Sequence, residues 1–383
     1  MKLKNLFTCT VTGLLLCTSC IKDEAPNAEA DILSCILPAE MLTGTDIDYN
    51  RPYDKSLNAY PIYIEVNNGT DLTRLAPTFE LTEGASIEPA SGSTQNFTNP
   101  VRYTVTSEDK NWHRTYAINI HYPETKSIPT VFNFENVKTV PYNKNEYYVL
   151  YEAASGYSTL TWSSGNQGFA LTGSGYAPND FPTSISPNGR TGNCLQLITR
   201  ETGSLGTLVG MPIAAGNLFI GSFDIGSAMS DALSATKFGT TFYYEPIKLV
   251  GYYKYKAGPK KFYENGEYTN RKDVFNIYAL FYEKTKDVQM LDGHITKNNY
   301  EHENMVAAAV ITDTHETSEW TRFELEFDYE HYGKTIDPQK LANGGYNVSI
   351  VLSASKDGDV FQGAPGSTLL IDDLELVCKQ PLR

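Results

Sequence analysis

Three acidic residues at alternate positions could perform hydrolytic chemistry. Glu324, Glu326 and Asp328 stand in the run Glu-Leu-Glu-Phe-Asp. On a β-strand, alternate side chains share one face and lie about 6.6 Å apart along the strand. This distance is within the range of the carboxylate pairs of glycoside hydrolases, so catalysis by this set is one prediction. The alternative is a strand with one face on the core and the acidic residues on the solvent-exposed face.

Aromatic side chains form a second set with binding chemistry. Sugar rings stack their C–H faces on aromatic rings while polar neighbours bind the hydroxyls, and the chain holds 26 Tyr and 3 Trp residues. A loop rich in Gly and Ser follows the second Trp, and binding residues are common in loops. We predict a carbohydrate-binding set of Trp162, Tyr243, Tyr252, Tyr253 and Tyr255. The alternative is that such rings fill a core, which is where we place Trp320.

Charge and missing motifs exclude other functions. The chain has 383 residues, and its 31 basic and 45 acidic residues give a net charge of −14. Nucleic-acid binding requires clustered Lys and Arg, so we expect no nucleic-acid partner. Neither the Gly-x-Ser-x-Gly motif of hydrolases nor a phosphate-binding or dinucleotide fingerprint occurs.

The length favours two domains, because a chain longer than about 250–300 residues generally forms more than one hydrophobic core.

Residues 1–19 have the pattern of a secretory signal. Lys2 and Lys4 precede an apolar run shorter than the about 20 residues of a membrane span. The small residues Thr18 and Ser19 before Cys20 resemble the lipobox of bacterial lipoproteins, in which the cysteine becomes the lipidated N-terminus. We therefore predict lipidation of Cys20. An ordinary thiol after plain secretory cleavage is the alternative.

Residues 20–35 are predicted to be a lipid-anchored tether. The run Ile-Lys-Asp-Glu at 21–24 resembles the signal that sends lipoproteins of glycan-degrading Gram-negative anaerobes to the outer cell surface. The following Pro, Asn, Ala and acidic residues are typical of a flexible stalk. The expected location is the outer membrane, exposed at the cell surface.

Residues 36–125 are predicted to form a β-sandwich. Apolar residues alternate at 62–66, 101–105 and 116–120, and polar turns separate these runs. The segments 70–77 and 103–109 resemble the Ig-like spacer modules of surface glycan-utilisation lipoproteins. A short interdomain linker with two prolines ends the domain at about residue 126.

Residues 126–383 are predicted to be all-β as well. No helical periodicity extends over a full window, so a jelly roll is the expected architecture. The predicted strands cover 130–135, 195–199, 218–224, 248–256, 274–282, 305–311, 322–329, 346–353 and 368–376.

This second region resembles a known family. The stretches 215–221, 251–258, 273–282, 320–323 and 353–376 occur in the order found in the family called "putative carbohydrate metabolism domain". The resemblance covers about residues 130–378. It implies a jelly-roll fold and a carbohydrate ligand, but no reaction. Capture of glycan for an uptake system would make an outer-membrane glycan transporter the partner.

The resemblance also suggests a structural calcium ion. Related jelly-roll modules join their first and last strands through calcium, and hard carboxylate oxygens suit this ion. Glu135, Asp372 and Asp373 stand at the corresponding strand ends. No other cofactor is required.

The sequence thus predicts a surface-anchored lipoprotein that binds polysaccharide or host glycan for a glycan-utilisation system. A jelly-roll glycoside hydrolase is the first alternative, and it requires the three carboxylates of the 324–328 strand to face a cleft. A structural or adhesive surface protein is the second, and it requires inward-packed tyrosines and no groove.

Overall fold

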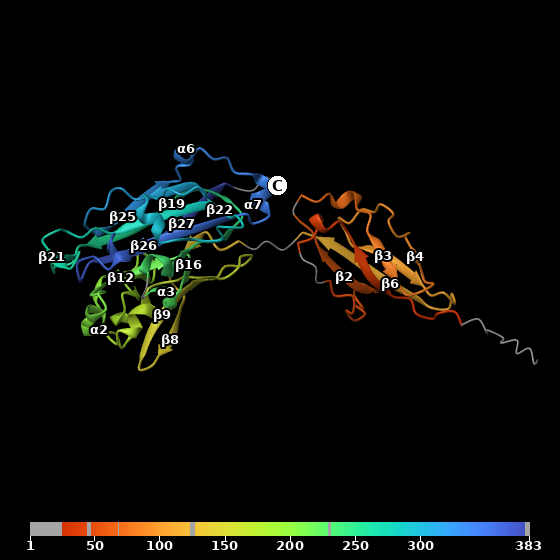
Figure 1. The fold of residues 1–383 in the computed structure, drawn as a ribbon, viewed down its shortest axis with the longest axis horizontal. Coiled ribbons are helices and arrows are strands. Elements are labelled where there is room, and N and C mark those ends of the chain that lie inside the picture. The colour runs from red at the N-terminus through yellow and green to blue at the C-terminus, as the bar shows by residue number, and fades with distance from the viewer. Residues whose placement is uncertain (1–24, 44–46, 68, 123–126, 229–230, 380–383) are drawn as a thin grey trace, which may run out of the picture. The chain divides into compact units, whose positions relative to one another are not determined.

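A computed structural model describes residues 25–43, 47–67, 69–122, 127–228 and 231–379. The chain divides into two compact units, Met1–Pro123 and Glu124–Arg383 (Figure 1). The predicted signal segment 1–19, the lipidation site Cys20 and the interdomain linker at residue 126 lie outside the described residues.

The smaller unit consists of two sheets around one core. β1 (Ile32–Ile36) pairs with β3 (Thr78–Leu81), and the second sheet has the order β2-β6-β5-β4. Its strands are β2 (Tyr60–Glu65), β4 (Ser86–Glu88), β5 (Val101–Thr106) and β6 (His113–His121), and β2 and β6 are parallel. Two 3₁₀ turns, η1 (Ala39–Met41) and η2 (Leu72–Arg74), connect strands. The alternating apolar residues meet inside, as the sequence pattern predicts.

The predicted tether extends too far along the chain. β1 begins inside the range 20–35 and ends one residue beyond it, and its residues Ile32 and Cys35 are buried in the core of the smaller unit. The inward side chains Ile32 and Cys35 pack into the core of the smaller unit, whereas Leu33 and Ile36 are exposed. The tether prediction is therefore wrong from Ile32 onward.

The larger unit is a sandwich of two antiparallel sheets, so the all-β prediction is confirmed. The first sheet has the order β11-β12-β27-β19-β25, with β7 paired to β27. Its strands are β7 (Val131–Phe132), β11 (Thr183–Ser186), β12 (Cys194–Ile198), β19 (Glu245–Lys256), β25 (Thr317–Glu326) and β27 (Thr368–Lys379). The long strands β19 and β27 pair with each other at the centre of this sheet.

The second sheet is covered on both faces. Its order is β15-β26-β22-β24 with β18 paired to β26, and its strands are β15 (Asn217–Phe219), β18 (Thr240–Phe242), β22 (Asn276–Glu283), β24 (Met305–Val310) and β26 (Tyr346–Ser353). The inner face joins the main core, and the outer face packs into a second cluster with Phe238 and Leu291. Nearly continuous apolar runs in β22 and β26 follow from this double burial.

Short strands and turns surround the sandwich. The hairpins and small sheets are formed by β8 (Val137–Tyr142), β9 (Asn145–Glu152), β10 (Leu160–Thr161), β13 (Arg200–Glu201), β14 (Ile213–Ala214), β16 (Gly221–Phe223), β17 (Thr236–Phe238), β20 (Phe262–Glu264), β21 (Glu267–Thr269) and β23 (Leu291–Asp292). Figure 1 shows α2, α3 and the β8–β9 hairpin in the yellow and green part of this unit, and β19, β22, β25 and β27 in its blue-green and blue part.

The helices of the larger unit are all short in the described part of the chain. They are α1 (Asn166–Leu171), α2 (Gly203–Leu208), α3 (Ile225–Ala228), α4 (Ala232–Ala235), α5 (His294–Lys297), α6 (Tyr329–Tyr332) and α7 (Pro338–Ala342), with 3₁₀ turns η3 (Pro178–Asp180) and η4 (Gly358–Val360). No helix among the described residues is long and apolar enough to cross a membrane.

Candidate functional site

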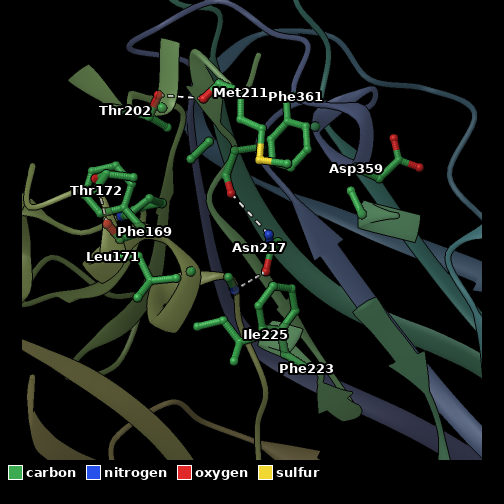
Figure 2. A pocket seen from close by; sticks show the side chains of 18 of the residues that line it. Phe169, Leu171, Thr172, Thr202, Met211, Asn217, Phe223, Ile225, Asp359 and Phe361 are labelled. Carbon is green, nitrogen blue, oxygen red and sulfur yellow. Dashed lines mark hydrogen bonds between the residues drawn. The ribbon is translucent and has the colours of Figure 1, made fainter. Parts of the chain in front are cut away.

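A cavity of about 370 Å³ lies in the larger unit, where α1, α2, α3 and η4 meet beside β15 (Figure 2). Most of its lining is apolar, and three phenylalanine rings contribute to it. The labelled apolar side chains are Phe169, Leu171, Met211, Phe223, Ile225 and Phe361. The volume suits a small ligand or one unit of a larger ligand, since ligand pockets span about 300–1,000 Å³.

Asn217 is a fixed polar group in the wall of the cavity. Its Oδ1 accepts a hydrogen bond from the Gly165 N–H at 2.9 Å, and its Nδ2 donates to the Ala215 carbonyl at 3.2 Å (Figure 2). A side-chain amide has two donor hydrogens and two acceptor lone pairs. One donor and one acceptor therefore remain for a ligand, in an orientation set by the backbone.

Two threonine hydroxyls of the lining donate to the backbone. Thr172 donates to the Phe169 carbonyl at 2.7 Å, and Thr202 donates to the Met211 carbonyl at 2.6 Å. These bonds use the hydroxyl hydrogens and leave only acceptor positions. The remaining polar capacity of the cavity lies at a third threonine, Thr236, at Asn217 and at one carboxylate.

That carboxylate is Asp359, in η4. Its Oδ2 accepts from Thr296 Oγ1 at 2.6 Å, and its Oδ1 accepts from Lys297 Nζ at 2.9 Å. These contacts join η4 to α5 and hold the side chain in place. Asp359 is the one carboxylate among the lining residues that the structure describes, whereas glycoside hydrolases generally use two.

Phe361 has a strained backbone. Its φ of 59° and ψ of 33° lie in the left-handed region, which bulky residues seldom adopt. The bonds Phe361 N to Gly358 O and Gln362 N to Asp357 O, each 3.1 Å, hold this turn. Gly358 allows this turn to lie close to Ala215, because a Cβ at position 358 would be 2.2 Å from the Ala215 Cβ. Such strain is concentrated at functional sites in proteins.

A smaller recess of about 70 Å³ adjoins the cavity. It shares Asn217, Phe223 and Asp359 with the cavity and adds Asn276 and Tyr278 on β22. Burial raises the pKa of Tyr278 well above its ordinary value, so its hydroxyl stays protonated. The recess thus adds an amide and a phenol to the largely apolar lining of the cavity.

Three of the five predicted aromatic residues lie in the core. Trp162 is 2% exposed and packs on Phe132, and Tyr253 and Tyr255 are each 2% exposed and flank Phe275. A buried ring cannot stack on a sugar, so the prediction is wrong for these three. Alternation along β19 directs Tyr253 and Tyr255 inward, and the loop residue Trp162 closes the end of the core.

The other two predicted rings lie near the surface. Tyr252 faces outward from β19, but the Arg190 guanidinium lies 3.6 Å from its ring centroid and occupies that face. Tyr243 is half-buried and is not among the lining residues of the cavity. Carbohydrate binding by Tyr243 stays a prediction.

The predicted calcium ligands do not meet around one point. Glu135 accepts from the Asn193 N–H at 2.9 Å and its Nδ2 at 2.8 Å, and Asp372 accepts from the Arg190 N–H at 2.6 Å. Asp373 forms an ion pair with the Arg190 guanidinium. The three carboxylates thus hold the 187–193 loop, and a cation beside this guanidinium would be repelled. No group of His, Cys, Asp and Glu in the described residues is arranged to hold a metal.

The predicted catalytic carboxylates serve ion pairs and a helix cap. Glu324 pairs with Lys248 and with Arg322 Nη2, the latter at 2.6 Å, and these contacts lower the pKa of Glu324. Asp328 caps α6 by accepting from the His331 N–H at 2.9 Å. Glu326 lies opposite Lys248 on the outer face of β25. A general acid requires a raised pKa, which Glu324 lacks.

The residues that form the cavity were missed in the sequence. Phe169, Phe223 and Phe361 are far apart in the chain, and only the fold brings them together. One signal was present: the segment 358–366 is rich in Gly and carries a single aromatic residue, which is typical of a binding loop.

The comparisons with known proteins agree on a carbohydrate-related family. Residues 133–377 match the family described as "Putative carbohydrate metabolism domain", and residues 55–120 match "SGBP, N-terminal". No curated protein matches the chain significantly.

Two crystal structures are similar over much of the chain. A "putative glycoside hydrolase" from Bacteroides vulgatus ATCC 8482 is 97% identical, with the match covering 67% of this chain and 100% of that one, at a TM-score of 0.65. A "putative glycoside hydrolase" from Bacteroides thetaiotaomicron VPI-5482 is 46% identical, with the match covering 94% of this chain and 99% of that one, at a TM-score of 0.62.

Proposed function

The chain belongs to the "putative carbohydrate metabolism domain" family, and on this premise we propose that it is a cell-surface glycan-binding protein whose larger unit holds one sugar unit in the cavity of Figure 2. Capture of polysaccharide or host glycan for an outer-membrane glycan transporter is the role proposed for it, with Cys20 as the lipid anchor in the outer membrane.

The observation that carries the proposal is the make-up of the cavity. Phe169, Phe223 and Phe361 provide faces for the C–H side of a sugar ring. Asn217 and Asp359 have unused hydrogen-bonding positions for hydroxyl groups. Aromatic rings combined with a few fixed polar groups are typical of sites that bind small molecules.

The hydrolase alternative is favoured by the names of the two similar crystal structures. The cavity supplies one carboxylate, and the paired carboxylates expected on β25 lie elsewhere, in ion pairs and a cap. We therefore propose binding without hydrolysis as the function of the cavity.

A glycan array read for both binding and released reducing ends tests this proposal. We expect binding of at least one glycan class with no release of reducing ends. The array is repeated with Phe361→Gly, since glycine adopts the left-handed backbone without strain and the variant should fold. Release of reducing ends that Glu326→Gln abolishes would contradict the proposal and make the protein a hydrolase.

A further inference from the structure

A second candidate site lies on the outer face of the six-stranded sheet, on strands that do not contribute to the cavity. It is an open groove of about 590 Å³ between β19, β27 and the start of β25. Its lining includes Lys254, Lys256, Glu316, Ser318 and Thr368. The whole chain carries a net charge of −14, so two lysines in one groove are a local reversal of sign.

The two lysines lie on the same side of β19. Alternation directs Lys254 and Lys256 outward, about 6.6 Å apart, while Tyr253 and Tyr255 point into the core. Within the described residues neither lysine forms an ion pair, unlike Lys248 earlier on the same strand, which pairs with Glu324. Both ammonium groups are therefore available to an anion.

The groove's own carboxylate is already neutralised. Glu316 forms an ion pair with Lys272 and accepts from the Ala257 N–H at 2.8 Å. The contact with Lys272 is the main cause that lowers the pKa of Glu316, so the group is ionised at neutral pH and its charge is balanced. Lys256 also contributes to the lowered pKa of Glu316, after Lys272. Lys254, Lys256 and Lys272 thus surround one carboxylate, and the groove keeps an excess of positive charge for a ligand.

An aromatic ring lies at the edge of this positive groove. The Lys254 ammonium is 5.0 Å from the ring centroid of Trp320, which is half-buried on the outer side of β25. The assignment of Trp320 to the core was therefore wrong. A cation–π contact at an exposed site is weaker than a hydrogen bond between charged groups. An anion would thus draw Lys254 off the ring and free the indole face.

We infer that this groove binds an acidic polysaccharide, with carboxylate or sulfate groups on Lys254 and Lys256 and a sugar face on Trp320. The inference concerns a site distinct from the cavity and does not depend on it. Charge complementarity selects the acidic glycan, and the indole ring selects a saccharide over other polyanions.

Fluorescence titration of the full chain tests the inference. The probes are oligogalacturonate against its methyl ester, and dextran sulfate against dextran. Trp320 should report binding, since Trp162 is 2% exposed and Trp112 lies in the smaller unit. We expect the charged member of at least one pair to bind about tenfold more tightly or better, and the pair that shows the difference distinguishes carboxylate from sulfate.

Variants separate this groove from general charge effects. The double variant Lys254→Gln, Lys256→Gln should lose at least about tenfold in affinity, while Lys248→Gln, on the same strand and face, should not. Phe361→Gly in the cavity should leave the titration unchanged, so failure of one site is distinguishable from failure of the other. The inference is overturned if uncharged and charged probes bind alike, if the double variant binds normally, or if inorganic polyphosphate binds as tightly as the acidic saccharides.

Discussion

At the scale of residues, burial decided which aromatic side chains could serve a ligand. Tyr252 and Tyr253 are neighbours of the same type, yet one faces the surface and the other the core. The alternation was readable from the sequence, but the direction of the core was not, because a shift of one residue exchanges the two faces.

Asp273 is a buried residue that anchors the loop carrying Phe361. Its Oδ2 accepts from Ser355 Oγ at 2.6 Å, Ser367 Oγ at 2.6 Å and the Ala364 N–H at 2.8 Å. These residues flank the loop that carries Phe361. The carboxylate therefore holds both ends of this loop and thereby fixes the position of the Phe361 ring.

Replacing Asp273 should destabilise the larger unit. Asp273→Ala leaves the buried Ala364 N–H and Ser367 hydroxyl without this acceptor, whereas Ser355 can turn to Thr199 Oγ1. Each unpaired donor costs about 1–3 kcal/mol, so we expect the free energy of unfolding to fall by at least about 2 kcal/mol. Denaturant unfolding followed by far-UV circular dichroism measures this. A change below about 1 kcal/mol would show that the loop does not depend on this group.

The charge of Asp273 should make its contribution depend on pH. Burial raises the pKa of this carboxyl from its ordinary 3.8, so its contribution to stability is fully present below 3.8 and is lost as pH rises through the folded-state pKa. Asp273→Asn lacks this titration. We expect the unfolding free energy of the wild type, relative to Asp273→Asn, to fall as the pH rises above about 4, and a constant or rising difference would contradict the assignment.

At the scale of elements, long strands were more predictable than short ones. The predicted run 248–256 coincides with most of β19, and the run 346–353 with the whole of β26, because their apolar pattern is long and regular. The hairpin of β8 and β9 was not predicted, since its apolar alternation is interrupted by charged and polar residues. The turns that bring Phe361 and Asn217 together depend on contacts distant in the chain, which no local pattern encodes.

β1 provides a test of how a short strand stabilises the smaller unit. It pairs with β3 and buries Ile32 and Cys35, and fully burying an apolar side chain contributes about 1.5–3 kcal/mol. A chain that begins at residue 37 should therefore lose at least about 3 kcal/mol of stability in the smaller unit. Thermal unfolding against a chain that begins at residue 25 measures the difference, and identical transitions would show that β1 is dispensable.

At the scale of the whole molecule, the two units have separate cores. The described core residues of the smaller unit form one cluster and those of the sandwich another, and both candidate sites lie within the larger unit. Composition and turn spacing were sufficient to predict two all-β regions, since these properties are averaged over many residues.

The larger unit should consequently bind without the smaller one. Residues 124–383, expressed alone, should fold and bind the array-selected glycan with the affinity of the full chain, because no described residue of the smaller unit lines the cavity. Isothermal titration of both proteins checks this. A folded larger unit with at least tenfold weaker binding would show that the smaller unit contributes to recognition.

The most direct test of the central claim is isothermal titration calorimetry of the array-selected oligosaccharide with Phe361→Gly. Leu208→Ala is the matched control, because Leu208 is 82% exposed beside the cavity and does not line it. We predict that Phe361→Gly keeps the wild-type unfolding transition and binds at least about tenfold more weakly, while Leu208→Ala binds normally. Unchanged affinity in Phe361→Gly would contradict the claim that the cavity binds glycan.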